Sequence, residues 1–124
     1  MKKKFIICFD LDNTICITRS NNYKLSKPKK KVVKIINDLY TKGFIIKIFT
    51  SRFMGRNNED VKLAKKKGFS FTKTQLKKWK INYHLLIMGK PSYDMFIDDK
   101  NLSFKSNWYK NFNIKKHLYK KKQQ

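Results

Sequence analysis

Acidic side chains are scarce in this chain, and half of them fall into two tight groups. Of the eight Asp and Glu residues, four are Asp10, Asp12, Asp98 and Asp99. Carboxylates gathered at one place repel one another unless a cation lies between them, and an oxygen-only site of this kind suits Mg²⁺. A carboxylate can also attack phosphorus and form an aspartyl-phosphate. The two groups therefore predict phosphoryl chemistry assisted by a divalent cation.

Four short apolar stretches are typical of buried parallel strands, and these elements must position the acids. Between the first two, a helical pattern opens at Pro28 and stops at Gly43. The resulting β–loop–α–β order is the unit of a doubly wound sheet, so we predict a Rossmann-like α/β fold with a central parallel sheet. The four stretches are Phe5–Leu11, Phe44–Thr50, Leu85–Met88 and Met95–Ile97.

The segment between the second and third predicted strands indicates two helices. The first covers residues 57–67 and ends at Gly68. The second begins at a capping box formed by Thr72 and Gln75. Further along, the aromatic residues after Asn101 indicate a packing helix or an edge element.

Ligands of open α/β sheets bind beyond the carboxyl ends of the strands, and polar residues of this chain gather at such ends. An ammonium group and a hydroxyl there can neutralise charge on the oxygens of a transferring phosphoryl group. A second carboxylic group must protonate the leaving oxygen and later deprotonate the attacking water. In strand order, the residues are Asp10, Asp12 and Asn13; Thr50, Ser51 and Arg52; Lys90; and Asp98 and Asp99.

Four motifs in this order resemble those of the haloacid dehalogenase superfamily of phosphatases. They are Phe9-Asp10-Leu11-Asp12-Asn13-Thr14, which resembles D-x-D-x-T, then Phe49-Thr50-Ser51, Gly89-Lys90-Pro91 and Phe96-Ile97-Asp98-Asp99. The resemblance covers about residues 5–100, and the chain is similar to small phosphatases of capsule and surface-polysaccharide loci. It implies a three-layer sandwich and Mg²⁺-dependent hydrolysis of a phosphomonoester, with a sugar phosphate or another small phosphorylated metabolite as substrate.

The resemblance also implies a role for each matching residue. Asp10 would be the nucleophile and a Mg²⁺ ligand. Asp12 would be the general acid/base, with its backbone carbonyl on the metal. Thr50 would hydrogen-bond the phosphoryl group, and Lys90 would position Asp10 and screen the phosphate.

The remaining matches concern the metal and the first turn. Asp98 would bind Mg²⁺ directly, and Asp99 directly or through water. The family usually has Gly where Asn13 stands. Because Asn tolerates a left-handed backbone better than other non-Gly residues, we expect the turn to survive.

The two places where the family inserts a cap domain are short in this chain. Residues 15–27 allow no more than a flap, and residues 52–84 hold at most two helices. We therefore expect a minimal cap or none, and an open site that accepts a bulky substrate end or is completed by a neighbouring subunit. The substrate contacts in such a site would come from Asn13, Ser51, Arg52 and Arg56.

The net charge of +23 leaves an alternative open. It is either a solvated lysine coat or a surface for nucleic acid, and base and phosphate recognition favours arginine, of which the chain has only Arg19, Arg52 and Arg56. A basic nucleic-acid-binding protein on the same fold is disfavoured, since carboxylates without a metal would repel phosphates. The two interpretations merge in a polynucleotide end (3′-) phosphatase.

Length and hydropathy bound the remaining expectations. The 124 residues suit one domain, which we place at residues 1–119, followed by a disordered basic tail over residues 120–124. No apolar run approaches the ~20 residues of a membrane span. The apolar run near the N-terminus stops at Asp10, short of the roughly 7–15 residues of an export signal. We therefore expect a cytoplasmic protein.

Overall fold

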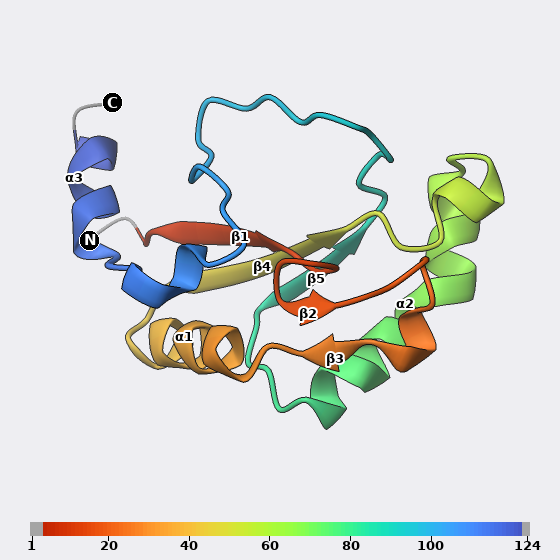
Figure 1. Cartoon of the computed structure of the whole chain (residues 1–124), viewed down its shortest axis with the longest axis horizontal. Helices are drawn as coiled ribbons and strands as arrows, with labels where there is room; N and C mark the ends of the chain where they lie inside the picture. The colour runs from red at the N-terminus through yellow and green to blue at the C-terminus, as the bar shows by residue number, and fades with distance from the viewer. Residues whose placement is uncertain (1–3, 123–124) are drawn as a thin grey trace.

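The centre of the fold is a sheet of three parallel strands. The chain is seen here in a computed structural model that describes residues 4–122, with side chains up to Leu118. The strands are β1 (Ile6–Asp10), β4 (Ile45–Thr50) and β5 (Leu85–Met88). Their order is β1-β4-β5, with β4 in the middle (Figure 1). This confirms the predicted parallel α/β sheet and three of its four predicted strands.

Both long helices pack on the same face of this sheet. They are α1 (Lys30–Thr41) and α2 (Val61–Lys78). Each right-handed crossover moves one strand further in the same direction, so both helices must cover one face. Figure 1 shows α1 below the sheet and α2 descending from its right-hand end to the same lower side. The core lies between these layers and includes Phe9, Ile36, Ile48, Leu76 and Leu86.

The opposite face of the sheet is open over parts of β1 and β5. Successive side chains of a strand point to opposite faces, and on this second face Ile6 and Leu85 are 49% and 47% exposed. Cys8 is exposed as well. The resemblance implied three layers, whereas the described residues place both long helices in one layer against the sheet.

Helix α1 follows the predicted helical pattern with a later start. Pro28 belongs to the short strand β3 (Lys27–Pro28), which pairs antiparallel with β2 (Cys16–Ile17). The helix therefore begins at Lys30 rather than at the proline. Gly43 adopts a φ of +94° just beyond its end, the left-handed conformation that favours glycine after a helix.

Helix α2 is continuous where the sequence predicted two helices. Gly68, which was expected to end the first predicted helix, lies buried within α2. The Phe53 ring packs so closely against it that a Cβ at this position would come within 2.3 Å of the ring. Close packing of that ring therefore explains a glycine that costs the helix about 1 kcal/mol relative to alanine. The helix begins at the cap Asp60, whose carboxylate accepts a hydrogen bond from the Leu63 N–H at 3.1 Å. Gln75 lies inside the helix, so the predicted capping box is wrong.

The predicted fourth strand, Met95–Ile97, is not formed in the described structure. Residues 89–107 contain no helix or strand, and the segment arches above β1 (Figure 1). Met95 and Ile97 are 78% and 88% exposed. The Glu59 carboxylate accepts hydrogen bonds from the Ser92 N–H (2.8 Å) and hydroxyl (3.0 Å), near the beginning of α2. This anchor ties the start of the segment to the beginning of α2. An apolar run as short as Met95–Ile97 is not a sufficient signal for a strand.

The C-terminal residues pack against the core, as the aromatic pattern predicted. The short helix η3 (Trp108–Asn111) places the Trp108 ring 6.3 Å from the Phe9 ring. It is followed by α3 (Lys115–Lys122), so residues 120–122 are helical rather than disordered, and residues 123–124 lie outside the described residues. No described helix has the length and apolar character to cross a bilayer.

Candidate active site

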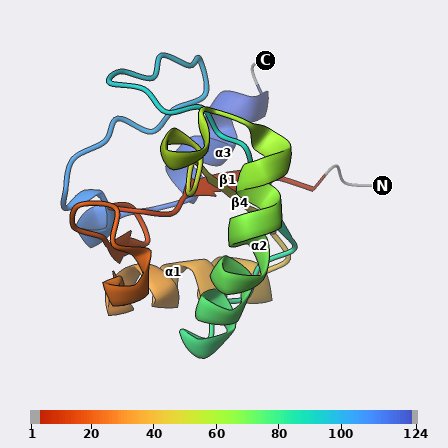
Figure 2. The ribbon, with the colours of Figure 1, turned by 90° about the vertical axis from the view of Figure 1, so that its right-hand side faces the viewer.

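The first predicted site residue, Asp10, lies at the carboxyl end of β1. Figure 2 views the sheet from this end. The Asp10 carboxylate accepts a hydrogen bond from the Thr14 hydroxyl at 3.0 Å. Its Oδ1 forms an ion pair with the Lys90 ammonium at 3.3 Å. The Asp10 side chain is 34% exposed, so it is held by two groups and still open to a ligand.

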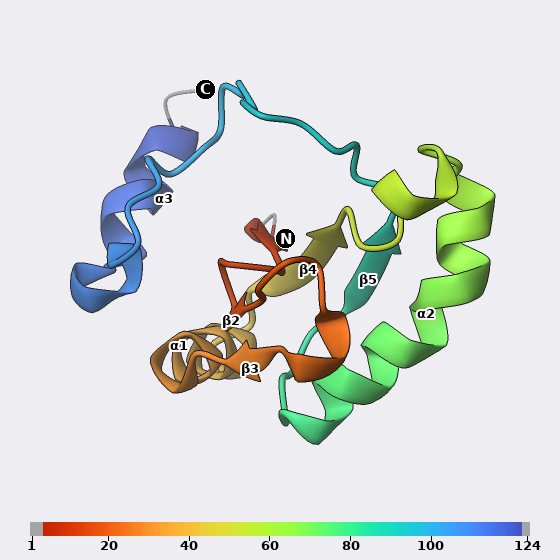
Figure 3. The ribbon, with the colours of Figure 1, turned by 45° about the vertical axis from the view of Figure 1, so that its right-hand side comes forward.

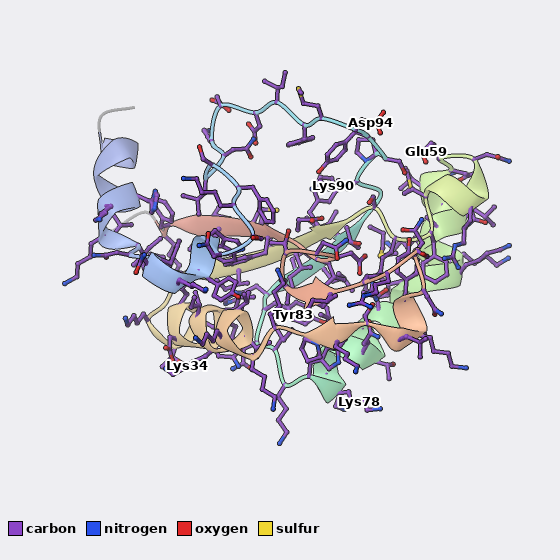
Figure 4. The ribbon with its side chains drawn as sticks, viewed as in Figure 1. Lys34, Glu59, Lys78, Tyr83, Lys90 and Asp94 are labelled. Atoms are coloured by element: carbon purple, nitrogen blue, oxygen red, sulfur yellow. The ribbon has the colours of Figure 1, made fainter. Side chains whose placement is uncertain are left out.

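Lys90 reaches Asp10 from beyond the end of β5, beneath the arching 89–107 segment (Figure 4). Gly89 links β5 to Lys90 and has a φ of +97°, a conformation that favours glycine. The Lys90 ammonium lies 5.2 Å and 5.1 Å from the ring centres of Tyr93 and Phe96. Burial alone lowers the pKa of Lys90, but the contacts with Tyr93 and Asp10 outweigh it and raise this pKa above its ordinary value. Lys90 is therefore a cation at neutral pH.

The second predicted acid, Asp12, is held by a buried arginine. The Arg52 Nε lies 2.9 and 3.1 Å from the two carboxylate oxygens, and its Nη2 lies 2.8 Å from Oδ1. Arg52 also donates to Gln75 Oε1 at 2.6 Å and to the Ser26 hydroxyl at 3.3 Å. The Thr18 hydroxyl donates to Asp12 at 2.5 Å. These contacts fix the orientation of a carboxylate whose side chain is 20% exposed.

Arg52 was expected to contact the substrate, and the structure gives it a different place. Its side chain has no exposed surface, and its donors are used by Asp12 and two other side chains, so it acts as a positioning residue. Thr50 is buried at the end of β4, and its hydroxyl accepts the Arg52 backbone N–H at 3.1 Å. That hydroxyl keeps its own proton for donation. Ser51, between them, is half-buried.

Asn13 adopts the left-handed backbone that its motif requires. Its φ is +63°, which confirms the expected turn. The turn is closed by a hydrogen bond from the Asn13 N–H to the Cys16 carbonyl at 2.7 Å, and the Asn13 side-chain oxygen accepts the Thr18 N–H at 3.1 Å. Asn13 therefore shapes the loop that carries Asp12.

Asp98 and Asp99 do not join the other two aspartates. Both are exposed on the 89–107 segment, where Asp99 and the Lys100 N–H lower the pKa of Asp98. In the described part of the chain, no group of three or more Asp, Glu, His or Cys side chains is arranged to hold a metal ion. The predicted four-aspartate cluster is therefore not formed, and each of the other two aspartates has a basic partner of its own.

Several residues around the two aspartates were given no role in the site by the sequence. The Thr14 hydroxyl belongs to the loop after β1, and the hydroxyls of Thr18 and Ser26 belong to the loop after β2. Gln75 also donates to the Tyr23 carbonyl at 2.8 Å, a contact across 52 positions. No local pattern indicates such a contact.

Cys16, buried next to Asp12, makes the free energy of unfolding depend on pH in the alkaline range. Burial raises the pKa of its thiol from 9.0 to about 11, and the Thr18 hydrogen bond offsets this only in part. Between these values the unfolded chain loses the thiol proton and the folded chain keeps it. The free energy of unfolding should therefore fall as pH rises from 9 to 11, by up to about 3 kcal/mol.

Urea denaturation of the wild type and of Cys16→Ala at several pH values measures this effect. The stabilisation is fully present below pH 9, and Cys16→Ala should flatten the decline above it. Cys8→Ala, which removes an exposed thiol, is the matched control and should leave most of the decline in place. Equal slopes for the wild type and Cys16→Ala would contradict the assignment.

Comparison with known proteins adds the fold alone. No family model and no curated protein matches the chain. The chain is similar to a target protein from Vibrio cholerae with a solved crystal structure, with a TM-score of 0.82 and 22% sequence identity. The match covers 97% of this chain and 99% of the other. At this identity the likeness supports a shared α/β architecture and does not assign an activity.

Proposed function

We propose that this protein is a Mg²⁺-dependent phosphomonoester hydrolase of the haloacid dehalogenase type, which acts through an aspartyl-phosphate on Asp10. The observation that carries the proposal is the environment of the Asp10 carboxylate. It stands at the carboxyl end of a parallel strand, is oriented by Lys90 and Thr14, and is 34% exposed. Ligands of open α/β sheets bind at this edge. The proposed substrate is a sugar phosphate or another small phosphorylated metabolite.

The reaction has two steps. In the first, a carboxylate oxygen of Asp10 attacks phosphorus, an O–P bond forms, and the bond to the ester oxygen breaks. In this proposal Asp12 takes up a proton from solvent before the ester bond breaks and passes it to the leaving oxygen. In the second step Asp12 takes a proton from water, the water oxygen attacks phosphorus, and inorganic phosphate leaves. The Asp10 carboxylate is restored, and one water is consumed for each ester.

The other side chains of the site orient the two aspartates and neutralise the negative charge of the phosphate. The Lys90 ammonium lies beside the nucleophile, where it screens the negative charge of an incoming phosphate. Arg52 and Thr18 hold Asp12 in one orientation. In this proposal the Thr50 hydroxyl donates a hydrogen bond to the phosphoryl group.

The donors at Asp10 suit Mg²⁺. Proteins commonly hold this cation with one or two carboxylates, several waters and a phosphate of the substrate, and the partly exposed Asp10 carboxylate fits that pattern. In this proposal the Asp12 backbone carbonyl is a second ligand, and waters and the substrate phosphate take the other positions, since Asp98 and Asp99 do not join the two aspartates of the site. A bound Mg²⁺ would neutralise charge on the phosphoryl oxygens.

Removal of the metal tests the proposal. Phosphate release should be measured from p-nitrophenyl phosphate and a panel of phosphorylated metabolites, with Mg²⁺ and with EDTA. We expect turnover that chelation abolishes and added Mg²⁺ restores. Absence of turnover with any divalent cation, or equal turnover in EDTA, would overturn the proposal.

A further inference from the structure

A pocket of about 440 Å³ lies between the loop after β2, the segment after β4 and α2. Its volume falls within the range of small-molecule sites. Figures 1 and 3 show the loop after β2 passing beside α2. Its lining includes Tyr23, Lys24, Phe53, Arg56 and Phe71. None of the pocket's lining residues is acidic.

Arg56 is held in one pose by contacts that do not neutralise it. Its Cζ lies 4.8 Å from the ring centres of both Tyr23 and Phe53. Its Nη2 donates to the Asn21 backbone carbonyl at 2.8 Å. Asn21 and the preceding Ser20 have φ values of +54° and +51°, a turn that positions this carbonyl. No carboxylate in the described part of the chain forms an ion pair with Arg56.

The Tyr23 ring joins this pocket to the candidate active site. Arg52, the residue that grips Asp12, also lies over this ring, with its Cζ 4.8 Å from the centre. The Tyr23 carbonyl accepts a hydrogen bond from Gln75, so the ring is tied to α2. The buried arginine and Arg56 therefore contact the same aromatic ring.

The two arginines differ in what remains for a ligand. Arg52 is fully buried, and its donors are used within the protein. Arg56 is exposed and uses one of its five N–H donors in the hydrogen bond to Asn21. Lys24, also exposed, adds a second positive charge to the same pocket. A guanidinium that packs against two rings, with free donors and no ion-pair partner among the described residues, suits a phosphate group.

We propose that the pocket of Arg56 and Lys24 binds a second phosphate group of the substrate, so that the protein prefers molecules that carry two phosphates. This rests on the proposed function, because the first phosphate is the one that Asp10 attacks. The pocket shares the Tyr23 ring with the arginine that positions Asp12, and it is therefore placed to hold the remote end of a molecule whose near end is hydrolysed.

Binding measurements test this without turnover. Isothermal titration in EDTA should compare adenosine 3′,5′-bisphosphate with adenosine 5′-monophosphate, two probes that differ by one phosphate. The wild type should bind the bisphosphate about tenfold more tightly or better. Arg56→Gln should remove most of this preference. Lys78→Gln, which deletes one positive charge at the far end of α2 (Figure 4), should keep it.

The outcomes separate this proposal from the proposed function. A wild type without preference for the bisphosphate, or an Arg56→Gln variant with the wild-type preference, would overturn the pocket assignment. Equal losses in Arg56→Gln and Lys78→Gln would also overturn it, since they would indicate general charge attraction. A preference that Arg56→Gln alone removes, together with no phosphate release in Mg²⁺, would leave the pocket standing and reject the hydrolase.

Discussion

If the proposed hydrolase acts through Asp10, an Asp10→Asn variant should lose phosphatase turnover by on the order of 10³-fold or more. The amide retains the size of the side chain and accepts the Thr14 hydrogen bond, but it cannot attack phosphorus as a carboxylate does. Initial rates of phosphate release at saturating Mg²⁺ measure the loss. Because Asp10 is partly exposed and the amide oxygen can still accept a hydrogen bond, the variant should fold, with a lower urea midpoint because the mostly buried Lys90 loses its charged partner.

Asp38→Asn is the matched control for that substitution. Asp38 is a carboxylate on α1 whose side chain is 54% exposed and pairs with Lys34 at 2.8 Å. The same chemical change there should leave turnover unchanged. If Asp10→Asn kept more than about a tenth of the wild-type rate, the aspartyl-phosphate mechanism would be rejected.

Asp12→Ala should lower the free energy of unfolding by about 3–5 kcal/mol, because it leaves the fully buried Arg52 cation without its carboxylate. The hydrogen bonds to Gln75 and Ser26 remain, but neither partner carries charge. Urea denaturation followed by circular dichroism gives the difference. The double variant Asp12→Ala/Arg52→Met should recover much of the loss, since it leaves no charge buried.

Asp38→Ala supplies the comparison for stability. It breaks an exposed i,i+4 ion pair, and such pairs contribute about 0.3–0.5 kcal/mol. A cost for Asp12→Ala as small as this one would show that the buried pair does not hold the loop after β1. Failure of Arg52→Met to restore stability in the double variant would point to lost packing rather than to an unpaired charge.

The parts of the fold that the sequence predicted rest on local signals. A short apolar run marks β1, and a helical pattern stopped by Gly43 marks α1. The Lys90–Asp10 pair spans 80 positions, yet it was predictable, because parallel strands deliver their carboxyl ends to one edge. The left-handed Asn13 followed from its place in the motif.

The parts that differed depend on contacts that a local pattern cannot contain. Gly68 reads as a helix stop, but the Phe53 ring packs against it from another segment, so the helix continues. Gln75 reads as a capping residue, but it binds Arg52 instead. The Met95–Ile97 run is typical of a strand, but the hydrogen bonds between Glu59 and Ser92 tie the start of its segment to the beginning of α2.

Strand β1 forms one border of the sheet, and beside it lies the uncovered surface that includes Ile6. A border of this kind invites edge-to-edge association of copies, which proteins commonly discourage with charge. At low ionic strength we expect the net charge of +23 to oppose this association by mutual repulsion. In about 1 M salt the screening length falls to about 3 Å, and we expect this protection to be lost. The abundance of lysine would therefore be a salt-dependent barrier to self-association.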